Sequence, residues 1–307
     1  MNMATIATAA AITCVASCAP TAGNTTAQTD GRVTYLCIGM ETSKRFGECP
    51  GCEKDAKTIT SIFKDELGYS GTTLCSSEAT KSKVVSLLKD GIAKTPEDGL
   101  FIFSYSGHGG QEALGGKEPD GSDSEDEYLC LYDTYMLDDE IWEIVSECRG
   151  RVFLYFDCCH SATMYRSIKS EKAAKFGAAA TPAVAVFDES GNPVPVSVQD
   201  DMVQSKGFTF KIPSRRVFKV SRDGSSREAG EGLRMLCWSG CKEAEYSYGS
   251  AFGGTMTLAV KKYWEKGLSY ETLWNNVSER VVAVQSGQTP VKTNVGGGFE
   301  EDMEAFR

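Results

Sequence analysis

Along the middle of the chain, short and continuous apolar runs alternate with stretches in which apolar residues recur every three or four positions. The continuous runs predict buried strands at 33–40, 100–105, 152–156 and 233–238. The spaced positions predict helices at 56–67, at 80–94 with Thr80 as the N-cap, from Asp138 as N-cap to Gly150, and at 256–266 and 273–284. Buried strands that alternate with amphipathic helices indicate an α/β protein, with a mostly parallel central sheet and helices on both faces.

The same pattern divides the chain into four parts. Residues 1–31 form a leader that we expect to be flexible, and residues 32–165 hold most of the predicted sheet. Residues 166–230 are rich in Ala, Ser and basic residues and predict an inserted linker, with a β-hairpin formed by 184–187 and 194–198. Residues 231–307 add further elements to the same sheet.

The leader lacks the features of an export signal or an anchor. It contains no Lys or Arg, whereas a secretory signal needs a basic segment, and no stretch reaches the roughly 18 apolar residues that span a bilayer. We therefore expect a cytoplasmic protein with no membrane partner. Residues 15–18 resemble a bacterial lipoprotein cleavage box, and that alternative stays open.

Composition narrows the possible chemistry. A hydrophobic fraction of 41% in 307 residues excludes wholesale disorder, and a net charge of −10 argues against a nucleic-acid partner. Only two histidines are present, so a zinc site built on several imidazoles is excluded. Twelve cysteines are too few for a disulfide scaffold in a chain of this length. Cys37 and Cys237 lie in apolar runs and are expected to be buried, reduced thiols.

Two predicted strands run directly into polar clusters. Residues 100–105 lead to Ser106, His108 and their glycines, and residues 152–156 lead to Asp157, two cysteines and His160. The carboxyl ends of parallel strands meet at one edge of a sheet, so an imidazole and a thiol are expected to lie close together there. Such a pair performs nucleophilic catalysis, because the imidazole takes the thiol proton. The backbone N–H groups of Gly109 and Cys159 are the candidate donors to the developing oxyanion.

These motifs, at 106–111 and 157–161, resemble the two catalytic motifs of metacaspases, the caspase-like cysteine proteases. Segments 236–241, 251–257 and 288–290 resemble the small-subunit region of that family. The similarity covers roughly 33–165 and 231–295, in the type I order and without a recognisable prodomain. The resemblance implies a caspase-like sandwich fold. It also implies self-processing at basic residues in or near the linker, a zymogen state and a link to programmed cell death.

The resemblance also implies residue roles. His108 matches the catalytic base and Cys159 the nucleophile, whereas Cys158 occupies a position that is often Ser. Metacaspases cleave after Arg or Lys, and a buried basic side chain needs a carboxylate partner. Asp55 and Asp157 match the aspartates of the S1 pocket, which binds the residue before the cleaved bond; Cys52 and Ser106 match further pocket positions. The alternative for Asp55 is a carboxylate that simply stabilises a helix N-terminus.

Calcium is a further implication of the resemblance. Asp123, Asp138 and Asp139 match three of the family's calcium ligands, and carboxylates suit Ca²⁺. The fourth position holds Arg166, whose charge repels a cation unless Asp126 or another group compensates. The alternative is that Asp138 and Asp139 only cap a helix.

Two other functions compete with a peptidase that acts as a monomer on proteins or peptides. A thiol oxidoreductase would use Cys49 and Cys52, which lie between a predicted strand and a predicted helix, as in thioredoxin-like motifs. That hypothesis leaves the His108 and Cys159 motifs unexplained. The second competitor is a catalytically inactive scaffold with the same fold.

Overall fold

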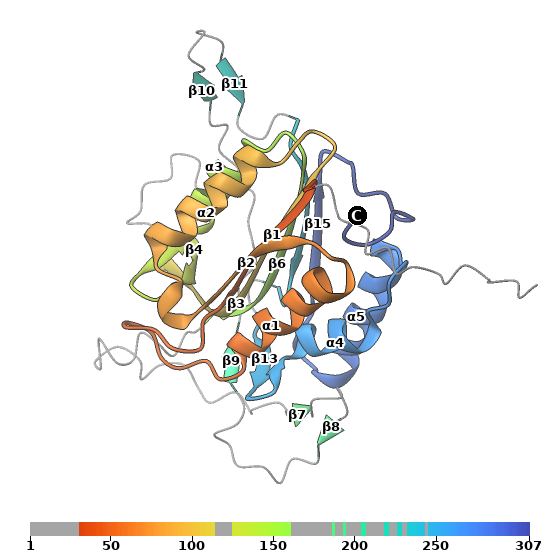
Figure 1. Cartoon of the computed structure of the whole chain (residues 1–307). Helices are drawn as coiled ribbons and strands as arrows, with labels where there is room; N and C mark the ends of the chain where they lie inside the picture. The colour runs from red at the N-terminus through yellow and green to blue at the C-terminus, as the bar shows by residue number, and fades with distance from the viewer. Residues whose placement is uncertain are drawn as a thin grey trace, which may run out of the picture.

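The computed structural model describes residues 31–113, 125–160, 232–242 and 245–307, together with five short strands between residues 186 and 228. Its centre is an eight-stranded sheet whose main path runs β15-β12-β6-β3-β1-β2 (Figure 1). The strands of this path are β1 (Val33–Gly39), β2 (Ser70–Cys75), β3 (Leu100–Ala113), β6 (Arg151–His160), β12 (Arg234–Ser239) and β15 (Val291–Val295). All pairs along the path are parallel except the antiparallel pair β12–β15. The predicted α/β architecture is confirmed.

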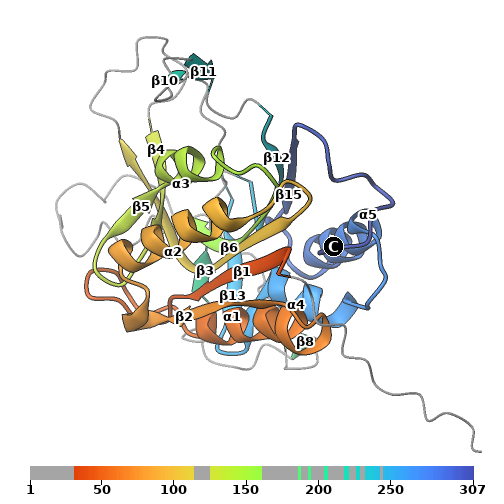
Figure 2. The same cartoon turned by 45° about the horizontal axis from the view of Figure 1, so that its top comes forward.

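Helices cover both faces of the sheet, as Figure 2 shows from a second direction. One face carries α2 (Lys81–Lys94) and α3 (Asp138–Val145), and the other carries α1 (Cys52–Ser61), α4 (Thr255–Tyr263) and α5 (Tyr270–Val284). A short π-helix, η1 (Ile62–Glu66), continues α1, and a 3-10 turn, η2 (Ser76–Glu78), follows β2. Because side chains alternate along a strand, each strand contributes to both cores. In β1, for example, Leu36 packs toward α2 and Cys37 toward α1.

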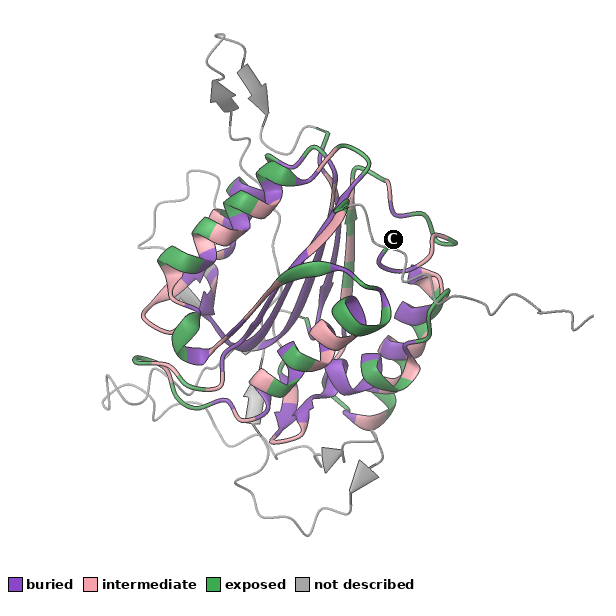
Figure 3. Cartoon of the chain, in the orientation of Figure 1, coloured by how far each residue is buried: buried purple, intermediate pink, exposed green. Residues whose placement is uncertain are grey.

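The central strands are the most deeply buried part of the molecule (Figure 3). Phe101, Phe103, Val152 and Leu154 fill the core beneath α2 and α3. The predicted burial of Cys37 and Cys237 is confirmed, and desolvation raises the pKa of each thiol to about 12. Both sulfurs are therefore protonated and inert at neutral pH.

Several smaller β-elements lie outside the main path of the sheet. Strand β4 (Glu125–Cys130) pairs with the far end of β3 and with β5 (Tyr135–Leu137). A separate antiparallel sheet joins β9 (Gln204–Lys206), β13 (Ser247–Ser250) and β14 (Gly253–Gly254). The predicted hairpin is present as β7 (Val186–Phe187) and β8 (Pro193–Val194), and β10 (Phe218–Val220) pairs with β11 (Ser226–Glu228).

Some predicted boundaries were wrong. The sequence predicted that β3 and β6 end before the polar motifs, but both strands continue through them to Ala113 and His160. Asp138 is the first residue of α3 rather than its N-cap; the N-cap is Leu137, whose backbone N–H donates to Glu140 Oε2 at 3.0 Å. Thr80 is the N-cap of α2 but provides no side-chain cap, and Lys81 N–H instead donates to Asp133 Oδ1 at 2.9 Å.

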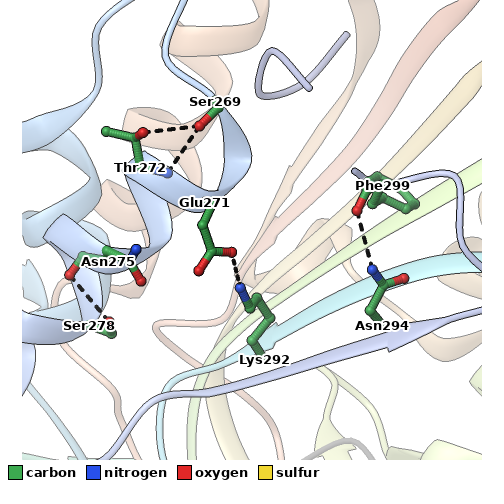
Figure 4. Close-up of polar contacts among 8 residues, drawn as sticks. All are labelled: Ser269, Glu271, Thr272, Asn275, Ser278, Lys292, Asn294 and Phe299. Atoms are coloured by element: carbon green, nitrogen blue, oxygen red, sulfur yellow. Dashed lines mark hydrogen bonds and ion pairs between the residues drawn. The ribbon is translucent and has the colours of Figure 1, made fainter. Parts of the chain in front are cut away.

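The last helix and the last strand fasten the C-terminal part to the sheet (Figure 4). Ser269 caps α5 by accepting a hydrogen bond from Thr272 N–H at 3.1 Å. Glu271, in the first turn of α5, forms an ion pair with Lys292 on β15 (Figure 4). Since β15 is an edge strand, this contact connects the helix directly to the margin of the sheet.

Candidate active site

The two polar motifs lie side by side, because β3 and β6 are parallel neighbours. In their register His108 pairs with Cys159, and Ser106 pairs with Asp157. Neighbouring strands lie about 4.7–4.9 Å apart, so the backbones of the predicted base and nucleophile are adjacent. The backbone of Gly109, a candidate oxyanion donor, pairs with His160 in the next position.

The His108 side chain is held at its ring and at its backbone. Nε2 lies 3.0 Å from the carbonyl oxygen of Glu48, and the residue is only 9% exposed. The single Tyr105 hydroxyl proton is shared between the carbonyl oxygens of His108, at 2.7 Å, and of Cys130, at 2.6 Å. Burial raises the pKa of Tyr105 well above its usual value, so this hydroxyl keeps its proton and remains a donor.

The two adjacent cysteines of the second motif are not equivalent. The Cys158 side chain is 0% exposed and belongs to the core beneath α2 and α3, with Phe156. Its neighbour Cys159 occupies the next position of β6, in register with His108.

Asp55, in the first turn of α1, connects three elements. Its carboxylate is 2% exposed and accepts a hydrogen bond from Ser106 Oγ at 2.6 Å. Gly254 N–H, on β14, donates to both carboxylate oxygens, at 2.8 and 3.0 Å. These bonds join α1 to β3 and β14. Asp55 therefore does more than stabilise the N-terminus of its own helix, which was the alternative considered from the sequence.

Asp157 is the second carboxylate that approaches β14. Its carboxylate is 0% exposed and accepts from Ser247 Oγ at 3.0 Å, from Thr257 N–H at 3.0 Å and from Thr257 Oγ1 at 2.7 Å. Behind it, Gln288 Nε2 donates to Ser247 Oγ at 2.9 Å. The hydroxyl of Tyr155 lies 3.0 Å from Thr257 Oγ1, and the Thr257 proton points to Asp157, so Tyr155 is the donor.

Glycines let the two carboxylates approach the same strand. A Cβ built on Gly254 would lie 2.1 Å from Asp157 Oδ2, and one on Gly253 would lie 2.4 Å from Asp55 Oδ1. The site thus brings two buried carboxylates to β14, and every donor named here is a neutral hydroxyl or backbone N–H group.

The remaining site predictions fare differently. Cys52 is buried at the start of α1, with its Sγ 2.8 Å from Cys49 Sγ. Asp138 is buried and accepts from the backbone N–H of its exposed neighbour Asp139 at 3.0 Å, and Asp123 lies outside the described residues. No three His, Cys, Asp or Glu side chains within the described segments lie close enough together to hold a metal ion.

Several residues that shape this site were not predicted from the sequence. Glu48 contributes a backbone carbonyl, which no side-chain motif reveals. Asp157 accepts hydrogen bonds from Ser247 and Thr257, and Gln288 in turn donates to Ser247. All three residues lie 90 or more positions further along the chain than Asp157. Thr257 and Gln288 lie in the segments 251–257 and 288–290, and the resemblance of these segments to the family was the sequence signal that could have identified them.

A mostly parallel sheet covered on both faces, with His108 and Cys159 in register on neighbouring strands, defines a caspase-like α/β protein. The model of the family described as "Caspase domain" matches residues 35–295, which is most of the chain. The chain therefore belongs to the caspase-domain family and is metacaspase-like.

Curated relatives include Metacaspase-1 of Sclerotinia sclerotiorum, 32% identical over 154 residues, or 43% of this chain and 34% of that protein. Metacaspase-1A of Aspergillus fumigatus is 26% identical over 296 residues, or 85% of this chain and 68% of that protein. The chain thus spans only about a third of the first relative. The crystal structure of protein GSU0716 from Geobacter sulfurreducens matches with a TM-score of 0.58 at 20% identity, covering 86% of this chain and 94% of that one. This last similarity shows the fold alone.

Among the described residues, no helix is both long and apolar enough to cross a bilayer.

Proposed function

We propose that the protein is a cysteine endopeptidase that hydrolyses peptide bonds after Arg or Lys, with Cys159 as nucleophile and His108 as base. The observation that carries this proposal is the register of β3 and β6, which pairs these two residues. Membership of the caspase-domain family and similarity to metacaspases support the same chemistry.

The contact of His108 with Glu48 selects the reactive ring nitrogen. A carbonyl oxygen accepts but does not donate, so Nε2 carries the proton in this hydrogen bond. In the neutral ring Nδ1 is then the basic nitrogen, and Nδ1 is the atom that takes the thiol proton. The Glu48 carbonyl orients the ring, as a third group does in other nucleophile–base pairs.

Two observations favour Cys159 over Cys158 as the nucleophile. The Cys158 side chain lies in the closed core under α2 and α3, where no substrate reaches it. Successive strand residues face opposite sides, and Asp157 bonds to Thr257 on α4, so position 159 falls on the face of Asp157.

The reaction then follows the ordinary two-step route of a cysteine peptidase. The Cys159 thiolate attacks the scissile carbonyl carbon, and the N–H groups of Gly109 and Cys159 are the proposed donors to the oxyanion. His108 returns its proton to the leaving amine, and the acyl group stays on sulfur. Water, deprotonated by the same imidazole, releases the product acid and restores the thiol.

The two buried carboxylates support a basic P1 side chain. Asp55 and Asp157 place two formal negative charges beside β14, and the Ser106, Ser247, Thr257 and Gly254 groups that donate to them are neutral. Burying a guanidinium or ammonium is prohibitive without such a partner, and an acidic P1 residue would be repelled. The other two proposed pocket residues are close to Asp55 in the structure. Ser106 donates a hydrogen bond to the Asp55 carboxylate, and Cys52 precedes Asp55 by one turn of α1.

Calcium activation, self-processing and a zymogen state remain predictions. Of the three calcium candidates the structure describes Asp138 and Asp139, and this adjacent pair does not supply the six to eight oxygens that Ca²⁺ requires.

Fluorogenic peptides with Arg, Lys or Asp at P1 test this function directly. We expect cleavage after Arg and Lys by the wild type, loss of cleavage in Cys159→Ala, and substantial activity in Cys158→Ala. Cleavage after Asp would overturn the S1 assignment, and activity that survives in Cys159→Ala but not in Cys158→Ala would reverse the nucleophile assignment. A folded protein that cleaves none of the peptides would favour the inactive scaffold.

A further inference from the structure

The loop before α1 holds two thiols together in a tight turn. Cys49 to Cys52 form a type II turn, with Pro50 second, Gly51 third at φ 91°, and Cys52 N–H donating to Cys49 O at 3.3 Å. The two sulfurs are 2.8 Å apart, closer than sulfur atoms in ordinary van der Waals contact. Both side chains are 0% exposed.

This turn is fixed at both ends to the candidate active site. Immediately before it, the Glu48 carbonyl contacts His108 Nε2 at 3.0 Å. Immediately after it, Asp55 N–H donates to Gly51 O at 3.0 Å, so the turn begins the helix that carries the Asp55 carboxylate. A Cβ on Gly51 would lie 2.1 Å from Ser250 O, which shows how closely the turn packs against β13 and β14.

From this geometry we propose that Cys49 and Cys52 form a reversible disulfide, and that its formation weakens substrate binding at the neighbouring site. The part of the proposal that concerns substrate rests on the proposed peptidase function, and the part that concerns the disulfide does not. A disulfide requires sulfurs about 2.0 Å apart, so closure draws them together by about 0.8 Å.

The oxidant is a small peroxide. Both residues are 0% exposed, so an oxidant reaches the sulfurs only when the loop opens locally, and hydrogen peroxide needs a smaller opening than a bulky disulfide does. One sulfur attacks a peroxide oxygen, the O–O bond breaks, and a sulfenic acid and one water form. The second thiol attacks the sulfenic sulfur, the S–S bond forms, and a second water leaves. Two thiols are oxidised while one peroxide is reduced to two waters.

A disulfide at this place acts on the site through the backbone. Closing the turn shifts its two ends, where Glu48 O orients His108 and where α1 presents Asp55. Displacements near 1 Å in such groups cost up to about 100-fold in rate. Because Asp55 is the proposed partner of the basic P1 side chain, its displacement should also weaken the binding of an Arg peptide at least about tenfold.

The first experiment maps disulfides in the full-length Cys159→Ala chain, in which the proposed nucleophile cannot be oxidised. The chain is treated with increasing hydrogen peroxide, alkylated, digested and analysed by mass spectrometry. We expect the peptide with Cys49 and Cys52 to lose two hydrogens at doses that leave Cys37 and Cys237 alkylated, and a reductant to restore it. Cys37 and Cys237 are matched controls because both are equally buried. Oxidation of the controls while Cys49 and Cys52 stay reduced would overturn the proposal.

The second experiment measures the affinity of a fluorescent Arg peptide by anisotropy before and after oxidation. Binding by Cys159→Ala should fall at least about tenfold and recover on reduction, whereas the Cys49→Ala, Cys159→Ala double variant should not respond. Equal affinity before and after complete disulfide formation would refute the coupling to the site. A reduced chain that binds no Arg peptide would instead contradict the proposed function, and the mapping would still decide whether the disulfide forms.

Discussion

Replacing Gly254 by Ala tests whether the two buried carboxylates form the substrate pocket. Gly254 lies at φ −73°, ψ 147°, an extended conformation that any residue adopts, so backbone strain is not the issue. The added Cβ would meet Asp157 Oδ2 at 2.1 Å, Cγ at 2.5 Å and Oδ1 at 2.7 Å. Ordinary contact begins at 3.4 Å, so the methyl and the carboxylate must separate by about 1.3 Å.

Asp157 has little freedom to accommodate this change. Its side chain is short and receives three hydrogen bonds, from Ser247 and Thr257. Overpacking of this kind costs about 1–3 kcal/mol of stability, and a displacement near 1 Å costs about 100-fold in rate. We therefore expect Gly254→Ala to fold with a lowered Tm and to lose about 100-fold in kcat/KM for an Arg peptide.

The assay compares kcat/KM and thermal unfolding for wild type, Gly254→Ala and Gly47→Ala. Gly47 is a matched control because a Cβ there meets nothing within 4 Å, so that variant should behave as the wild type. A folded Gly254→Ala protein whose kcat/KM for Arg peptides stays within about threefold of the wild type would refute the assignment of Asp157 to the pocket.

Two further predictions concern pH and calcium. Burial raises the pKa of Cys37 and Cys237 to about 12, from 9.0 for an ordinary thiol. The folded state keeps protons that the unfolded state loses above pH 9, so the free energy of unfolding should fall by roughly 1 kcal/mol per pH unit for each thiol between pH 9 and 12. Urea unfolding across this range should show a shallower fall in Cys237→Ala, and an identical slope would contradict the argument. If calcium activates the enzyme, added Ca²⁺ should raise the rate of peptide cleavage, and Asp138→Asn should reduce that response. A cleavage rate that changes with neither Ca²⁺ nor EGTA would contradict activation by calcium.

Burial explains which strands the sequence predicted. The central strands are apolar on both faces and stand out as continuous runs. Strands β2 and β15, which lie at the two ends of the sheet path, were not predicted from the sequence. An edge strand contacts fewer neighbours, and Ser70–Cys75 accordingly has a single buried residue, while Val291–Val295 has none. Neither strand therefore carries the continuous apolar run that marks a buried strand.

The ends of β3 and β6 were misjudged for a related reason. The apolar run stops at Ser106 and Asp157, because these two polar side chains face the site, although Cys158 still packs in the core. Hydrogen bonding between the strands nevertheless continues, since it depends on the backbone and not on side-chain polarity. Hydrophobicity marks the extent of the core, not the extent of a strand.

Only the residues of the candidate site that lie in local sequence motifs were predicted. His108 and Asp157 stand in recognisable segments at strand ends, so their proximity followed from parallel topology. The contact of His108 with Glu48 spans 60 residues, and the contact of Asp157 with Thr257 spans 100. Such pairings depend on how the whole chain packs, and one sequence does not reveal them.

Covalent labelling of the nucleophile tests whether Cys159 and His108 act as a catalytic pair. The wild type and a His108→Ala variant are incubated with an Arg chloromethyl ketone peptide, and the modified residue is located by mass spectrometry. We expect a single adduct on Cys159 in the wild type, formed at least about 100-fold more slowly in the variant because the base is absent. An adduct on Cys158 or Cys52, or equal labelling of Cys159 with and without His108, would contradict it.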